Sequence, residues 1–274
     1  MHSSGPGTSG CTVSVSPNIQ SAQEKSFPMS QKIAFITGGN RGIGFQTALE
    51  LKDIAKVVIG SRNLVQGEQA AEKLRAAGAD ADVLEFDITP PTAPQVAYDY
   101  FNSRYGRLDI LINNAGIAAA SFSSTGPEHR AADIPLDLLH RVFATNFFAQ
   151  VALTQALLPL LKQSPAGRIV NLSSILGSLT LHADPASPIY NAKSFAYDAS
   201  KTALNAFTVH LAYELRDTKI KVNSAHPGWV KTNLGGPHAP MELSEGAKTS
   251  AALATLPEDG PSGGYFHLGQ PLPW

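Results

Sequence analysis

A tyrosine and a lysine stand four positions apart in this chain, as Tyr197 and Lys201. They open a run with the apolar spacing of a helix, and residues four apart on a helix share one face. A free phenol has a pKa of about 10, which is too high for easy proton exchange near neutrality. A lysine ammonium on the same face favours the phenolate. The pair therefore predicts a proton-transfer site with Tyr197 as the acid.

Tyr190 and Lys193 form a second pair of the same residue types, spaced by three positions. Pro185 and Pro188, just before them, predict a loop rather than a helix. We therefore assign Tyr190 to the wall of a pocket or to the surface, and not to the chemistry.

A serine, Ser174, ends the apolar run 167–174, which we predict to be the fifth strand. Ligands bind at the carboxyl ends of the strands in a parallel α/β sheet. Ser174 is therefore predicted to lie at the ligand-binding edge of the sheet.

Asn146 lies inside a long apolar helix that we expect to begin near Ile134. A buried asparagine needs hydrogen-bond partners. Two interpretations stay open: a satisfied core residue, or a kink whose freed backbone carbonyl holds a water near the reacting groups.

These residues need a scaffold, and a glycine-rich turn at 37–44 indicates which one. It lies between a predicted strand at 32–36 and a predicted helix at 45–51. Gly38 allows a tight turn, while Gly42 and Gly44 leave room for a pyrophosphate and for close packing of helix on strand. The helix N-terminus offers free N–H groups to phosphates. We favour a dinucleotide site over a merely structural turn.

The second predicted strand, 56–60, ends in Ser61-Arg62-Asn63 without the acid that would bind the ribose hydroxyls of NAD. Arg41 and Arg62 instead suit a 2′-phosphate, which favours NADP(H) over NAD(H). The alternative is that both are solvated surface arginines. Asp87, in the predicted third strand and its exit at 82–88, is placed to meet the adenine, or to cap the helix that begins near Thr92.

Strands and helices alternate along the chain, with a helix at 64–77 and a fourth strand within 107–116. The fold class we predict is α/β, a single-domain doubly wound Rossmann fold with a central parallel sheet flanked by helices. Asn113 and Asn114 end the fourth strand, and Ala115-Gly116 leaves room for a ribose. We place this domain at 31–274. Residues 1–30 are rich in Ser, Gly and Pro, and we expect them to be a disordered leader, or a misplaced start ahead of Met29.

The composition of the 274-residue chain limits the classes of partner that we expect it to bind. The net charge of −1 gives no field for nucleic acid or anionic membrane. The single cysteine, Cys11, excludes an intrachain disulfide, and we expect a cytoplasmic location. Polar residues within 137–161 favour a buried helix over a membrane span. His182, His226 and His238 have no ligand-like spacing, so we expect no metal site.

Taken together, these motifs resemble the short-chain dehydrogenase/reductase family over residues 31 to about 268. The matching pieces are the glycine-rich turn, the segment 113–116, the Asn146 helix, the segment 171–177, the Tyr197/Lys201 pair and Pro227-Gly228. The stretch from Pro227 to Trp274 resembles the NADPH-dependent carbonyl reductase branch. The number of residues between Ser174 and Tyr197, however, differs from the number that is usual in that branch.

The resemblance implies a catalytic set and a set that binds NADPH/NADP. The catalytic residues would be Asn146, Ser174, Tyr197 and Lys201. The cofactor residues would be Gly38, Asn40, Arg41, Gly42, Ile43, Gly44, Arg62, Asn63, Asp87, Ile88, Asn114, Ala115, Gly116, Tyr197, Lys201, Pro227, Gly228, Val230 and Thr232.

The function expected is reduction of a ketone or aldehyde to an alcohol by hydride transfer from NADPH, with Tyr197 donating the proton. An alcohol dehydrogenase working in the oxidative direction and a non-catalytic NADP(H) sensor are the alternatives. The extra loop at 179–195 should overhang a moderately apolar substrate, and 234–255 should form a lid. Phe122, Leu176, Trp229, Leu234 and Met241 should lie near the site. Monomer and homo-oligomer both stay open.

Overall fold

The computed structural model describes residues 1–2, 31–118 and 130–274. Nearly all of the leader proposed for 1–30 lies outside these residues, and so does Phe122. The assignment of 31–274 to one domain stays a prediction.

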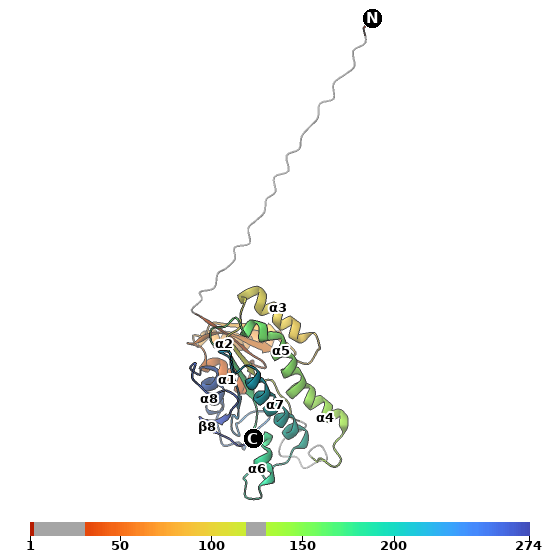
Figure 1. The fold of residues 1–274 in the computed structure, drawn as a ribbon, viewed down its shortest axis with the longest axis vertical. Coiled ribbons are helices and arrows are strands. Elements are labelled where there is room, and N and C mark those ends of the chain that lie inside the picture. The colour runs from red at the N-terminus through yellow and green to blue at the C-terminus, as the bar shows by residue number, and fades with distance from the viewer. Residues whose placement is uncertain (3–30, 119–129) are drawn as a thin grey trace.

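Eight strands form one sheet in the order β3-β2-β1-β4-β5-β6-β7-β8 (Figure 1). Each pair from β3 to β7 is parallel, and only β8 runs antiparallel to its neighbour. The strands are β1 (Lys32–Ile36), β2 (Ala55–Ser61), β3 (Ala81–Glu85), β4 (Ile110–Asn113), β5 (Arg168–Leu172), β6 (Lys221–Ala225), β7 (Tyr265–His267) and β8 (Gln270–Pro271). The predicted parallel sheet is confirmed, while β6, β7 and β8 had not been predicted as strands.

Helices cover both faces of the sheet, as the doubly wound prediction requires. They are α1 (Gly42–Glu50), α2 (Leu64–Ala76), α3 (Ala93–Tyr105), α4 (Leu136–Phe143), α5 (Ala149–Leu161), α6 (Leu179–Ala183), α7 (Phe195–Glu214) and α8 (Leu243–Ala254). Shorter turns are the π-helix η2 (Ala144–Phe148) and the 3₁₀ helix η3 (Ile175–Gly177).

Alternate side chains of the inner strands pack in two separate cores, one on each face of the sheet. Ile33 and Phe35 of β1 pack in the core that α3, α5 and α7 cover. Ala34 and Ile36 of the same strand pack in the core that α1, α2 and α8 cover. This period of two follows from the strand pleat, and it places both faces of the sheet out of water.

One stretch, Leu136–Leu161, is long and apolar enough to cross a membrane by length and composition alone. Half of its most apolar window is buried in the fold. Its α5 part contributes Leu153 and Leu157 to the first core, and both are fully buried. The stretch is therefore a core helix of this fold, interrupted by η2.

A row of buried polar side chains crosses the middle of the sheet. Asn113 donates to Thr154 of α5 (2.9 Å) and to Asn171 of β5 (2.8 Å). Asn171 donates to Thr208 of α7 (2.8 Å), whose hydroxyl lies 2.8 Å from that of Ser224 in β6. Asn113, Asn171 and Ser224 are register partners on adjacent strands, so the row ties three strands to two helices.

Candidate active site

A cavity of about 1430 Å³ lies where the strands of the sheet end. All of the predicted catalytic and cofactor residues line it except Asn63 and Asn146. The parallel order explains this gathering, because it brings the carboxyl ends of all the inner strands to one edge.

The glycine-rich turn forms one wall of the cavity. Gly38 and Gly42 have positive φ angles of 64° and 58°, in the left-handed region that glycine enters without strain. A Cβ atom on Gly44 would lie 2.5 Å from the Asn114 side-chain nitrogen. That amide donates to the backbone carbonyls of Thr37 (2.7 Å) and Gly38 (3.1 Å). The turn is therefore clamped from β4 and leaves its backbone open to the cavity.

Polar groups from the glycine-rich turn and from the ends of β2 and β3 form the next part of the wall. Arg41 and Arg62 both line the cavity and are exposed. Asp87 lines it too, and its carboxylate accepts from the Thr89 backbone N–H (3.0 Å) and hydroxyl (2.8 Å). That carboxylate therefore stabilises its own turn instead of capping the helix near Thr92, which has no side-chain cap.

The Asn63 prediction differs from what the structure shows. Asn63 is the N-cap of α2, and its side-chain oxygen accepts from the Gln66 backbone N–H at 2.9 Å. It does not line the cavity. An asparagine just before a helix satisfies an otherwise unpaired donor, which is a structural reason for its place here.

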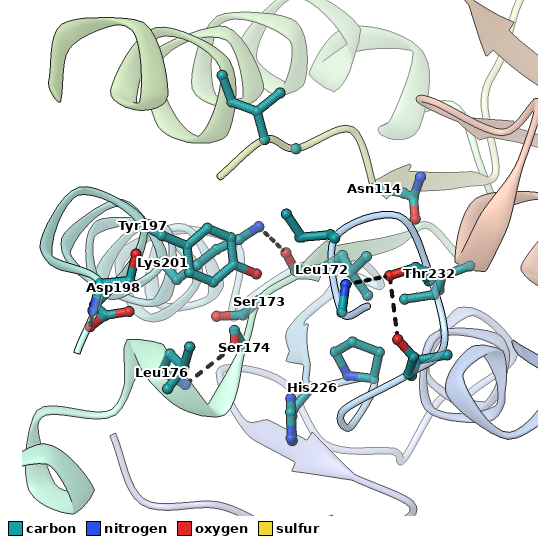
Figure 2. A pocket seen from close by; sticks show the side chains of 18 of the residues that line it. Asn114, Leu172, Ser173, Ser174, Leu176, Tyr197, Asp198, Lys201, His226 and Thr232 are labelled. Carbon is teal, nitrogen blue, oxygen red and sulfur yellow. Dashed lines mark hydrogen bonds between the residues drawn. The ribbon is translucent and has the colours of Figure 1, made fainter. Parts of the chain in front are cut away.

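Ser174, Tyr197 and Lys201 meet at one corner of the cavity (Figure 2). Ser174 follows β5, and its hydroxyl is near enough to the Tyr197 phenol to lower the pKa of that group. Lys201 lies one turn after Tyr197 in α7, and its Nζ is 5.6 Å from the centre of the tyrosine ring. The same Nζ donates to the Leu172 carbonyl at 2.6 Å. The helix face shared by Tyr197 and Lys201 is therefore turned to the end of β5.

Burial controls the ionisation of this corner. It raises the pKa of Tyr197 to about 12, against the opposing effect of the Ser174 hydrogen bond, and the Asp198 charge raises it further. Burial also lowers the pKa of Lys201 to about 8. Near neutral pH the phenol thus carries its proton and can donate it, while Lys201 stays mainly cationic.

Asn146 stands behind this corner in η2, the π-helical turn between α4 and α5. Its side chain accepts from the Ile117 N–H (2.8 Å) and donates to the Ile117 carbonyl (2.8 Å) and to the Ser200 hydroxyl (3.0 Å). The core interpretation therefore holds for the side chain. The irregular helix also fits the predicted kink, since π-turns rearrange the backbone hydrogen bonds.

A histidine joins the Ser174 loop to the segment after β6. His226 is buried, and its Nδ1 accepts from the backbone N–H of Ile175 (3.1 Å) and of Gly228 (3.3 Å). Burial lowers its pKa to about 3, so the ring is neutral. Its place directly before Pro227-Gly228 is the only sequence signal that could have singled it out.

The model of the family described as short chain dehydrogenase matches residues 32–242. The chain belongs to this family. It is 32% identical to carbonyl reductase [NADPH] 1 of Mus musculus, over 89% of this chain and 99% of the relative. It is 31% identical to salutaridine reductase of Papaver bracteatum, over 86% of this chain and 94% of that protein.

Solved structures agree with the family. The NADPH-bound carbonyl reductase from chicken fatty liver has a TM-score of 0.74 and 26% identity, with 89% of this chain and 99% of that chain covered. Carbonyl reductase Sniffer of D. melanogaster has a TM-score of 0.74 and 30% identity, with 89% and 99% covered. The predicted fold, the resemblance to the carbonyl reductase branch and the assignment as an oxidoreductase are confirmed.

The short-chain dehydrogenase differs from prediction on the substrate side. Its 179–195 segment, expected as a loop, contains the helix α6. Residues of α6 and of the chain that follows it line the cavity. Tyr190 is outside the lining and 38% exposed, which agrees with its assignment to the surface. Of the expected lid, only Leu234, Gly235 and Leu243 line the cavity, because α8 packs its buried face in the sheet core.

Among the residues expected near the substrate, Leu176, Trp229 and Leu234 line the cavity. Met241 does not, because it lies under the Pro227-Gly228 turn, where a Cβ on Gly228 would overlap its sulfur. Asp198 and His182 line the cavity without having been assigned a role in it. No spacing in the sequence joins these two, since they come from α7 and α6.

Proposed function

We propose that this protein reduces a ketone or an aldehyde to an alcohol with NADPH. The observation that carries the proposal is the corner of Ser174, Tyr197 and Lys201 at the end of a glycine-walled cavity. A buried, protonated phenol beside a hydroxyl is suited to donate a proton to an oxygen that both groups can reach.

The cavity fits NADP(H) on its own residues. Gly38, Gly42 and Gly44 line it without side chains that would keep a pyrophosphate from the backbone, Arg62 follows β2 where an NAD site would carry an acid, and Arg41 lies in the glycine-rich turn. NADPH is named for the carbonyl reductases of Mus musculus and chicken fatty liver. Arg41 and Arg62 would hold the 2′-phosphate, and Gly116 and Lys201 would lie beside the nicotinamide ribose.

The bound cofactor supplies a hydride for the carbonyl carbon. The Ser174 hydroxyl hydrogen-bonds to the carbonyl oxygen and polarises it, and Tyr197 gives its proton to that oxygen as negative charge develops there. The Lys201 ammonium, held by the Leu172 carbonyl, stabilises the phenolate that remains. Asn146 helps to position this corner, because its side chain hydrogen-bonds to Ile117 and to Ser200, the residue before Lys201.

The test follows NADPH absorbance over a panel of aromatic ketones, aldehydes, quinones and ketoesters, with NADH in parallel. Tyr197→Phe should lower turnover by about 10²–10⁴-fold while NADPH binding is retained. Tyr190→Phe is the matched control, because this tyrosine is also followed by a lysine but lies outside the cavity. Unchanged turnover in Tyr197→Phe, or tight NADPH binding with no turnover on any carbonyl, would contradict the proposal and favour a sensor.

Direction, location and assembly are separate proposals. The same residues serve alcohol oxidation, so alcohols with NADP⁺ complete the assay. We expect a cytoplasmic protein without nucleic acid or membrane partners, which fractionation of cells expressing the full chain would test. Light scattering would decide between monomer and homo-oligomer.

A further inference from the structure

Asp198 lines the cavity and keeps one buried carboxylate oxygen without a hydrogen-bond partner in the described part of the chain. It follows Tyr197 in α7 and is 8% exposed (Figure 2). Its Oδ2 accepts from the Ser194 backbone N–H at 2.8 Å, at the start of the helix. Its Oδ1 is buried and has no hydrogen-bond partner among the residues that the structure describes. A buried acceptor without a donor is unfavourable, so this oxygen calls for an explanation.

The neighbouring cationic groups do not pair with this oxygen. Lys193 Nζ lies 3.0 Å from His182 Nδ1 and 2.7 Å from the His182 carbonyl. Because an ammonium only donates, Nδ1 must accept, and the ring proton of the neutral histidine is on Nε2. That Nε2 lies 2.9 Å from the Leu176 carbonyl and 3.4 Å from Asp198 Oδ2. His182 therefore divides one proton between two acceptors and leaves Oδ1 free.

Helix capping alone does not require a carboxylate at this position. An asparagine would accept the Ser194 hydrogen bond equally well and would bury no charge. Burial raises the pKa of Asp198 to about 7, opposed by the Ser194 hydrogen bond and the Lys193 charge. The buried carboxylate thus lowers the stability of the fold, and such a loss of stability is common at groups that bind a ligand.

The surroundings of Asp198 indicate the kind of ligand. Leu176, Leu179 and Ile189 line the same cavity with apolar side chains. A few polar groups in a largely apolar pocket fix the orientation of a small molecule. Tyr197, the proton donor, lines the same cavity, so a substrate bound at Tyr197 shares that cavity with Asp198.

We propose that Asp198 Oδ1 accepts a hydrogen bond from the substrate and selects carbonyl compounds that carry a hydroxyl or N–H group. The proposal rests on the proposed function for the position of the reacting carbonyl. Asp198 determines specificity and takes no part in the proton transfer.

The test compares matched ketones: 3′- and 4′-hydroxyacetophenone against their methoxy counterparts, which lack the donor. The wild-type protein should favour one hydroxy compound by about tenfold or more in kcat/KM, the effect of a hydrogen bond to a charged group. Asp198→Asn should abolish this preference, because its amide presents a donor where Oδ1 was. A merely structural role would change kcat/KM for both compounds by the same factor and would overturn the proposal.

Asp184→Asn is the control, since this aspartate directly follows α6, is exposed, and uses its carboxylate to accept from the Ala186 backbone N–H. It should keep the wild-type preference. If no ketone is turned over, calorimetric titration of the NADPH-saturated protein with the same compounds separates the two proposals. Tighter binding of a hydroxy compound that Asp198→Asn abolishes supports the Asp198 proposal while the proposed function fails. Equal binding of both compounds, or no binding of either, overturns it.

Discussion

Gly44→Ala tests whether the glycine-rich turn is built for close approach. In an isolated helix the change would be favourable by about 1 kcal/mol, because alanine is the better helix former. In this fold the new methyl group would lie 2.5 Å from the Asn114 side-chain nitrogen and 2.7 Å from the Gly38 carbonyl. Either the Asn114 clamp or the turn itself must move.

The two costs exceed the helix gain. Overpacking at such a site destabilises by about 1–3 kcal/mol. A displaced Asn114 amide loses its bonds to Thr37 and Gly38, each worth about 0.5–1.5 kcal/mol. We expect a net loss of about 3 kcal/mol, which lowers Tm by roughly 6–12 °C in a chain of this size. Affinity for NADPH should fall as well, since the moved backbone lines the cavity.

Thermal unfolding with and without NADPH measures both effects. Gly116→Ala is the steric control for stability, because its Cβ would meet nothing closer than 3.4 Å. The double variant Gly44→Ala/Asn114→Ala should show a coupling energy, since the second change removes the nearest clashing atom. A Gly44→Ala protein with the Tm and the NADPH affinity of the wild type would refute the reasoning.

Three further predictions follow from other parts of the structure. Arg62→Ala should weaken NADPH binding about tenfold or more and leave NADH binding unchanged in fluorescence titrations, whereas equal losses would argue against a 2′-phosphate site. Arg168→Met should lower the unfolding free energy in urea by about 3 kcal/mol or more, because the buried guanidinium donates five hydrogen bonds to backbone carbonyls that would lose them. The folded pKa of Asp198, about 7, exceeds its unfolded value of about 3.9, so the native state binds the extra proton and loses stability as pH rises through this window. The Tm of Asp198→Asn should therefore rise relative to that of the wild type between pH 5 and pH 8, with His182 and Lys193 kept in both proteins. A Tm difference that does not change with pH would contradict this prediction.

Local spacing made much of the site predictable. The pair Tyr197/Lys201 and the turn at 37–44 depend on residues within one or two helical turns, so periodicity alone places them correctly. Asn63 caps α2 without lining the cavity, and its cofactor role stays a prediction, because a helix cap and a ligand contact use the same residue type at the same place. The sequence pattern does not distinguish a cap from a ribose contact until the cavity is seen.

Contacts between distant segments could not be predicted. Helix α6 begins where Ser178 and Thr180 donate to the Trp274 carbonyl, at 3.1 and 2.9 Å, from nearly a hundred residues earlier in the chain. The environment of Asp198 depends in turn on His182 of that helix. Met241 lies next to the site as expected, but only the fold shows that it packs against the Gly228 turn without lining the cavity.

The polar row through Asn113, Asn171, Thr208 and Ser224 has a consequence for how this chain can diverge. Each amide or hydroxyl orients the next, so changing one member leaves a buried neighbour without its partner. A library of single substitutions should therefore find these positions nearly invariant. Libraries that randomise them jointly should recover apolar combinations, because replacing a whole buried network can be neutral for stability. Divergence at these positions would therefore require several substitutions at once, in residues from three neighbouring strands.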